Sequence, residues 1–159
     1  MKSLKLIGRI SIASLLLTVM LTSCKKYDEG PAFSLKSKAE RITNKWKVEQ
    51  AILSDGQDLT NEWKDASLEF KKNGRYTIIK FSPDQSMKSE EVGSWGFTNK
   101  KEYIGTIGTE KEIMTVSGQV IDEFSTDVLW KITKLKEDEL WIWLLYTDGK
   151  HEELRLKPL

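Results

Sequence analysis

The sequence predicts an all-β protein, a small antiparallel up-and-down barrel of about eight strands with a short N-terminal helix. Apolar and polar residues alternate with a period of two through most of residues 46–156, which is the pattern of half-buried strands. The segments between them are short and polar, and Asn73-Gly74 and Asp148-Gly149 are strong hairpin signals. No segment is long enough for a helical crossover, so we expect antiparallel strands whose closure into a barrel removes exposed edges.

The N-terminus has the layout of a secretory signal peptide, which we expect to span residues 1–23. Its basic residues are Lys2, Lys5 and Arg9. A largely apolar run follows, from Ile10 to Leu21, and it is shorter than the roughly 20 apolar residues that span a bilayer as a helix. A cleaved signal is therefore favoured over a permanent transmembrane helix.

The signal ends in Leu21-Thr22-Ser23-Cys24, which resembles the lipobox of bacterial lipoproteins. The resemblance implies that the Cys24 thiol is alkylated with diacylglycerol and that the chain is cut before Cys24. It also implies that the new amine receives a fatty acyl chain such as palmitate. Several acyl chains hold a protein stably on a membrane, whereas one chain does so only marginally. The alternative is an ordinary secretory signal with an incidental cysteine.

Residues 24–33 are expected to be a lipidated tether, because charge, glycine and proline there oppose regular structure. The charged residues after the anchor either resemble the export tags of some surface lipoproteins or form a solvated spacer. Lys25 is not the aspartate that commonly retains lipoproteins at the inner membrane, so the outer membrane of the cell envelope is favoured. The domain would face either the periplasm or the outside.

Residues 34–159 are expected to form one domain. The chain has a single cysteine, so once Cys24 is lipidated no disulfide can support the fold, and packing must hold it together. The signal holds three basic residues and no acidic one, which leaves 22 basic and 24 acidic residues in the mature part. A nearly neutral domain without a basic patch does not match a nucleic-acid binder.

A short helix is expected over residues 34–45, where Ser37 and Glu40 have the spacing of a capping box and Ser34 is a rival N-cap. Its apolar stripe would consist of Leu35, Ala39 and Ile42. A helix of this length is marginal alone, so it should pack against the barrel.

The helix is followed by segments rich in β-formers. We expect strands at 45–52, 67–70, 75–81, 92–98, 102–107, 112–117, 128–133, 139–146 and 152–156. Gly108 would separate the fifth segment from the sixth, and residues 118–127, with Ile121 and Phe124, would form a loop. Several of these segments carry tryptophan or tyrosine, which suits a barrel core.

Hairpin and aromatic motifs along the chain resemble the lipocalin-like domains of lipoproteins from Gram-negative bacteria. The motifs are Asn44-Lys45-Trp46-Lys47, Phe70-Lys71-Lys72-Asn73-Gly74-Arg75-Tyr76-Thr77, Gly93-Ser94-Trp95, Trp130-Lys131-Ile132-Thr133-Lys134-Leu135, Asp138-Glu139-Leu140 and Asp148-Gly149. The resemblance spans residues 42–157 and implies a compact barrel whose base is plugged by a tryptophan, for which Trp46 is the candidate. In the wider lipocalin superfamily such barrels carry small apolar ligands in the lumen.

Aromatic residues on separate strands are the candidate ligand contacts. Tyr76, Trp95 and Trp130 could line a common cavity, because aromatic rings with one polar atom are typical walls of binding sites. They could equally fill the core, since an eight-stranded barrel is only just wide enough for side chains or one small ligand. Residues 54–66 could form a lid over the mouth with Trp63 pointing inward, or a polar surface loop that Trp63 anchors.

The segment 139–146 is apolar on both faces, with Trp141 and Trp143 on one face and an aliphatic row on the other. One face must line the lumen. The other would be covered by the 34–45 helix or would be exposed as a patch for an envelope protein or a membrane surface.

No catalytic or metal-binding constellation is recognised. His151 is the only histidine, so a Ser-His-Asp arrangement or a His-based metal site would depend on this one residue at a strand end. We therefore expect no enzyme activity, cofactor or metal. The expected function is that of a membrane-anchored envelope lipoprotein whose barrel binds a small apolar or amphipathic ligand. The alternative is a structural or interaction lipoprotein in an envelope complex.

Overall fold

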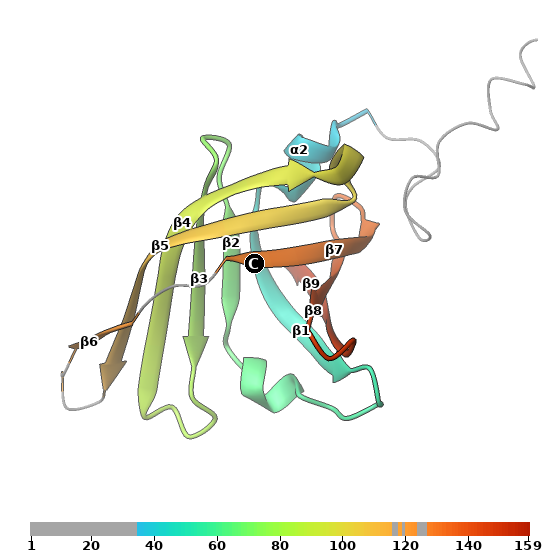
Figure 1. The fold of residues 1–159 in the computed structure, drawn as a ribbon. Helices are drawn as coiled ribbons and strands as arrows, with labels where there is room; N and C mark the ends of the chain where they lie inside the picture. The colour runs from blue at the N-terminus through green and yellow to red at the C-terminus, as the bar shows by residue number, and fades with distance from the viewer. Residues whose placement is uncertain (1–34, 116–117, 119, 124–126) are drawn as a thin grey trace, which may run out of the picture.

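The computed structural model describes residues 35–115, 118, 120–123 and 127–159. Their strands form one antiparallel sheet in the order β4-β3-β2-β1-β9-β8-β7-β5-β6, which a further pairing of β4 with β5 closes (Figure 1). The strand bounds are Lys45–Leu53 (β1), Ser67–Phe70 (β2), Arg75–Phe81 (β3), Met87–Thr98 (β4), Tyr103–Thr115 (β5), Val120–Glu123 (β6), Val128–Leu135 (β7), Leu140–Leu145 (β8) and His151–Pro158 (β9). The predicted small antiparallel barrel is confirmed. The signal peptide 1–23, Cys24 and the tether 24–33 lie outside the described residues.

The barrel has eight walls, because β6 and β7 share one wall. Lys111 of β5 lies opposite Glu123 in β6, and Thr106 of β5 lies opposite Val128 in β7. These pairings have the same register, so β6 and β7 are successive parts of one strand path beside β5. The loop predicted over 118–127 is therefore wrong for residues 120–123, which form β6, whereas Phe124 lies outside the described residues.

The first and last strands close the barrel. β1 pairs with β9 from Trp46 opposite Pro158 to Leu53 opposite Glu152. The inward rows of both strands are apolar apart from Glu152 near the start of β9, and Trp46 is fully buried in the main core cluster. Burying an aromatic side chain of this size contributes about 5 kcal/mol to folding. The apolar residues of the alternating sequence pattern therefore meet in one continuous barrel interior.

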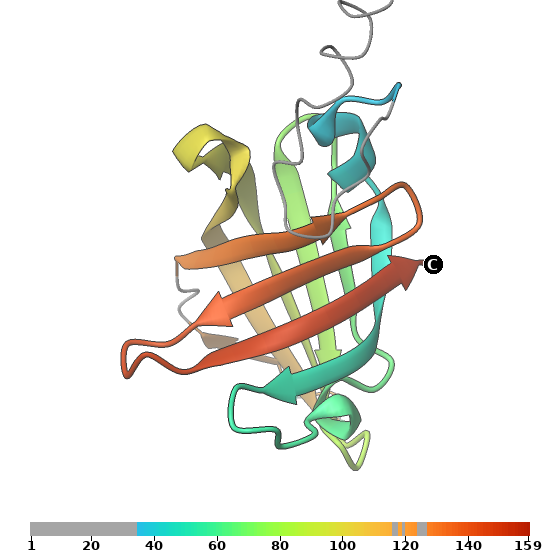
Figure 2. The same ribbon diagram turned by 90° about the vertical axis from the view of Figure 1, so that its right-hand side faces the viewer.

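A short helix, α2 (Lys38–Ile42), lies at one end of the barrel in both views (Figures 1 and 2). The Ser37–Glu40 capping box is present, and the Trp46 indole N–H donates to the Ile42 carbonyl at 2.9 Å, which ties the ring to the end of the helix. Arg41 donates to the Leu135 carbonyl of β7 at 2.6 Å, so the helix is fixed at this closed end. Within the described residues, no helix is both long enough and apolar enough to cross a bilayer.

The helix predicted over residues 34–45 is wrong in length, and so is its apolar stripe. Leu35 precedes the helix and is 92 % exposed, and Ala39 is also exposed, while Ile42 is fully buried. The helix ends at Ile42 because the chain turns at once into β1, and five residues cannot present three apolar positions on one face. Burial of Ile42 and Arg41 holds the segment instead.

A β-bulge corrects the predicted alternation in β1. The register with β9 shifts between Val48 and Gln50, so that Ala51 rather than Ile52 is the fully buried residue in the second half of the strand. A bulge adds one residue and reverses the direction of every later side chain. A strict period of two therefore predicts the wrong face after Val48.

The two segments predicted around Gly108 are one strand, β5, with a bulge against β4. Gly93 of β4 lies opposite Gly108, and a Cβ at Gly93 would stand 2.2 Å from the Ile107 carbonyl oxygen and 2.8 Å from the Tyr76 ring. The missing side chain lets β5 approach β4 closely while the Tyr76 ring fits beneath them. Gly108 therefore marks a close contact inside a strand, not a break between two strands.

The two predicted hairpin turns are confirmed. Gly74 joins β2 to β3 with φ +79°, and Gly149 joins β8 to β9 with φ +84°, a conformation that glycine adopts without strain. All eight walls and the whole buried cluster come from residues 42–159. A chain that begins at residue 25 therefore keeps the complete barrel.

Replacing Gly93 by alanine should destabilise the barrel by about 2 kcal/mol, because the added methyl group collides with backbone and with the Tyr76 ring. Gly96→Ala is the matched control on the same strand, since a Cβ there meets no atom within 4 Å. Urea unfolding of residues 25–159 measures both. Equal stability of the two variants would contradict the close packing at Gly93.

Candidate ligand-binding site

The three aromatic residues predicted as cavity walls lie in the packed part of the barrel. Tyr76 and Trp130 are buried, and the Trp130 indole N–H donates to the Thr106 hydroxyl at 3.3 Å. Trp95 packs edge-on against Phe70 and Phe97 and donates to the Lys71 carbonyl. None of the three borders either cavity described below. Their packing matches the core-filling alternative, and their part in ligand binding stays a prediction.

Trp63 lies at the other end of the barrel from α2. It ends the 3-10 helix η2 (Thr60–Trp63), which lies at the open end in Figure 1. The side chain is only 6 % exposed, its indole N–H donates to the Glu152 carboxylate of β9, and the Lys80 ammonium of β3 lies 4.0 Å from its ring centroid. Residues 54–66 thus bring Trp63 inward between two walls of the barrel, a position that fits both the predicted lid and the predicted loop anchored by Trp63.

Glu152 is a carboxylate buried inside the open end, with 4 % of the residue exposed. One carboxylate oxygen accepts from Trp63, and the other accepts from the Tyr146 hydroxyl at 2.9 Å. Partial burial and the hydrogen bond to Glu152 raise the pKa of the Tyr146 hydroxyl to about 12. Both partners are neutral donors, so the two hydrogen bonds replace the water that the buried carboxylate has lost.

A cavity of about 340 Å³ lies at this open end, among β3, β4, β5 and η2. It is lined by Glu62, Lys80, Phe81, Ser82, Pro83, Met87, Ser89, Lys111 and Ile113. The volume is within the range of small-molecule sites, which are about 300–1,000 Å³. The closed half of the barrel is filled by side chains, whereas the open half is hollow and has a mixed lining.

The ladders show which side chains face this hollow. Lys80 pairs with Ser89, and Ser89 pairs with Ile113, so these three side chains lie on one face in one row across the wall. Two residues further in, Glu91 pairs with Lys111 and accepts a hydrogen bond from the buried Tyr76. The row of Lys80, Ser89 and Ile113 and the next pair inward, Glu91 and Lys111, therefore lie on the interior face of the wall, as the core residues do.

The charged residues of the lumen are the functional candidates that the sequence analysis missed. Lys80 lies four residues after the buried Tyr76 in β3, and Glu152 lies two residues before the buried Leu154 in β9, so both face the interior of the barrel. Charged residues on the inward row near the ends of strands are the signal that could have revealed a polar mouth.

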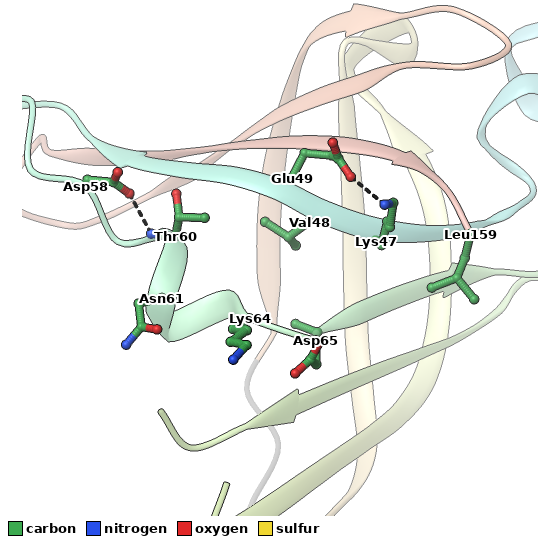
Figure 3. Close-up of a pocket in the computed structure, with 10 residues that line it drawn as sticks. Lys47, Val48, Glu49, Asp58, Thr60, Asn61, Lys64, Asp65 and Leu159 are labelled. Atoms are coloured by element: carbon green, nitrogen blue, oxygen red, sulfur yellow. Dashed lines mark hydrogen bonds and ion pairs between the residues drawn. The ribbon is translucent and has the colours of Figure 1, made fainter. Parts of the chain in front are cut away.

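A second, larger hollow of about 820 Å³ lies outside the barrel between β1 and the 58–66 segment (Figure 3). Lys47 and Glu49 form an ion pair at 2.6 Å on β1, and Lys64 and Asp65 point away from that pair. Asp58 accepts from the Thr60 backbone N–H at 2.8 Å, and its hydrogen bonds to Thr60 lower the pKa of its carboxyl. The exposed charges here already have partners or point outward, so this groove does not converge on a ligand.

Trp141 and Trp143 lie on the outer face of β8, where charged side chains cover them. The Trp141 ring lies between the Lys134 ammonium, at 3.8 Å from its centroid, and the Arg155 guanidinium, at 4.3 Å. Trp143 contacts the Lys131 ammonium at 4.8 Å. The prediction that the N-terminal helix covers this face is wrong, because α2 lies at the closed end (Figure 2). Cation–π contacts provide the cover instead.

His151 stacks on the Trp143 ring with 4.1 Å between the ring centroids, which places it on the outer surface at the end of β9. Over the described ranges, no group of three or more His, Cys, Asp or Glu residues is placed to hold a metal ion.

Comparison with protein-family models finds no match to the chain, and none of the curated proteins that were searched matches it.

The Tyr146–Glu152 hydrogen bond predicts a stability loss at alkaline pH. Between pH 10 and pH 12 the unfolded chain releases the tyrosine proton while the native state retains it, so the free energy of unfolding falls as pH rises through this window. Tyr146→Phe should weaken that fall. Urea unfolding at several pH values measures it, with Tyr103→Phe as the control for loss of a tyrosine hydroxyl elsewhere. Unchanged pH dependence in Tyr146→Phe would refute the assignment.

Proposed function

We propose that the protein is an exported lipoprotein anchored by acyl chains on Cys24 to the outer membrane of the cell envelope. The support is the order of a basic segment, an apolar run and the lipobox-like Leu21-Thr22-Ser23-Cys24. The charged tether 24–33 would join the anchor to the barrel near α2, because α2 is the first described element and lies at the closed end. The open end would then point away from the membrane.

Cys24→Ala should abolish incorporation of labelled palmitate and move the protein out of the membrane fraction, because the thiol is the lipid acceptor. Ser23→Ala is the matched control, since it keeps a small residue before an intact cysteine. Expression in a Gram-negative host, followed by fractionation and palmitate labelling, measures both. A Cys24→Ala chain that still carries label would refute the anchor.

We further propose that the barrel is a non-enzymatic binding module for a small amphipathic ligand, held at the open end. The observation that carries this proposal is the cavity of about 340 Å³ lined by both polar and apolar side chains, above a filled core. A ligand with one polar end and one apolar part matches this lining. Of the aromatic candidates, Trp63 would gate the mouth, while Tyr76, Trp95 and Trp130 would form the packed floor.

Native mass spectrometry of residues 25–159, purified gently from cell envelopes after release from the anchor, should show a discrete added mass that disappears on denaturation. Ile113→Trp, which places a large ring in the cavity, should remove that mass. Met114→Trp is the matched control, because the next residue of β5 is exposed on the outer face. An apo mass for the wild type across several growth conditions would oppose ligand binding.

The second candidate function is a structural or interaction lipoprotein whose outer face joins an envelope complex. The observation that favours it is the half-buried pair Trp141 and Trp143 on the outside of β8, within a layer of charged side chains. Tryptophan and arginine are enriched at the centres of protein interfaces. An apo barrel in the mass measurement would move the proposal to this face.

A further inference from the structure

We propose that the cavity at the open end selects an anionic amphiphile, with its negatively charged group at Lys80 and its apolar chain towards the rim. The inference rests on the proposed binding function and adds the chemical class of the ligand. It comes from the way in which charges, hydrogen bonds and apolar side chains are distributed over the inner surface of the mouth.

The carboxylates inside the mouth already have donors. Glu91 accepts from Tyr76, and Glu152 accepts from both Trp63 and Tyr146. A cationic ligand would have to compete with these hydrogen bonds for oxygens that are buried or partly buried. Both oxygens of Glu152 therefore have a donor and Glu91 has one at Oε1, and neither glutamate is among the residues that line the cavity.

The Lys80 ammonium, in contrast to these carboxylates, contacts an aromatic ring face. It lies 4.0 Å from the centroid of the Trp63 ring and, among the described residues, has no ion pair within 4.0 Å. An ammonium group has three donors, and a ring face uses its charge without accepting a conventional hydrogen bond from each of them. Lys80 can thus donate to an anion that enters the cavity while the Trp63 ring stays in contact.

Among the described residues, the lining of the cavity carries more positive than negative charge. Two basic residues, Lys80 and Lys111, border the cavity, and one acidic residue, the exposed Glu62 of η2, does so. Lys111 is the cross-strand neighbour of Glu91 on the inner rung. An anion placed near Lys80 would therefore be attracted by both lysines. The hydroxyl of Ser89, which pairs with Lys80, donates to the Lys80 carbonyl oxygen at 3.4 Å.

The apolar part of the lining sets the direction of the ligand. Along β3 and β4 the order from the core to the rim is the Glu91 rung, the row of Lys80 and Ser89, and then Met87, which is exposed at the end of the ladder. Ile113 and Phe81 flank this outer part of the cavity. The charged group consequently lies inward and the chain extends outward along Met87.

The test compares ligands with the same ten-carbon chain and different head groups, using isothermal titration calorimetry on residues 25–159. The probes are decanoate, 1-decanol and decyltrimethylammonium, with acetate as the anion that has no chain. Decanoate should bind about tenfold more tightly than decanol or the cation, because a hydrogen bond to a charged group is stronger than one to a neutral group. Acetate should show no binding at the same concentrations.

Lys80→Met should reduce the preference for decanoate over decanol to less than about threefold, whereas Lys80→Arg should retain most of it. Lys88→Met is the matched control on the neighbouring strand, since Lys88 pairs with Glu90 at 2.8 Å on the other face of the wall and should leave the preference unchanged. Circular dichroism verifies that each variant is folded, and the head-group comparison on the wild type does not depend on any variant.

The outcomes separate the two proposals. Equal affinity for decanoate, decanol and decyltrimethylammonium would overturn the anionic selectivity and leave the proposed binding function in place. Tightest binding of decyltrimethylammonium would overturn it in favour of recognition by Glu91 or Glu152. If none of the three ten-carbon probes binds, both the proposed amphiphile-binding function and the proposed selectivity are refuted. Binding of acetate as tight as that of decanoate would reduce the site to a simple anion site.

Discussion

The pairing of β1 with β9 is the constraint on which the rest of the structure depends. It joins residues from the two ends of the domain along most of both strands, and it removes the two edges that an open antiparallel sheet would leave. Closure also fixes where the inward rows meet, so that Trp46, Leu154 and Leu156 enter one core. The chain has no disulfide with which to achieve this, and packing across the closure must supply the stability.

The closed barrel is not uniform along its length. At the end where α2 lies, Trp46 packs with buried aliphatic side chains in the main core cluster. At the other end the inner rows become polar, η2 brings Trp63 across the mouth, and a cavity remains among β3, β4 and β5. A filled half gives the fold its stability, and this allows the hollow half to carry polar side chains that a small core could not tolerate.

Charged side chains inside the barrel have different interaction partners from those on its outer surface. Inside, Glu152 and Glu91 accept hydrogen bonds from neutral donors, the indole of Trp63 and the hydroxyls of Tyr146 and Tyr76. Outside, Lys134 and Arg155 lie on both faces of Trp141, and this cover lets a large apolar ring remain on the surface. The sequence shows these residues only as alternating letters, and the two roles differ because alternate residues of a strand face opposite sides of the wall.

The sequence by itself determined the fold class, most strand positions and the two glycine hairpins, because these depend on local periodicity and turn chemistry. It could not determine the length of the helix, the bulges in β1 and β5, or β6, because those depend on contacts with strands distant in the sequence. The composition of the candidate site also depends on the tertiary structure. Lys80, Glu91, Lys111 and Glu152 come from four strands, and only the closure of the barrel turns their side chains towards one mouth. A strand pattern reports which residues share a face, whereas the register between distant strands decides which of those faces meet.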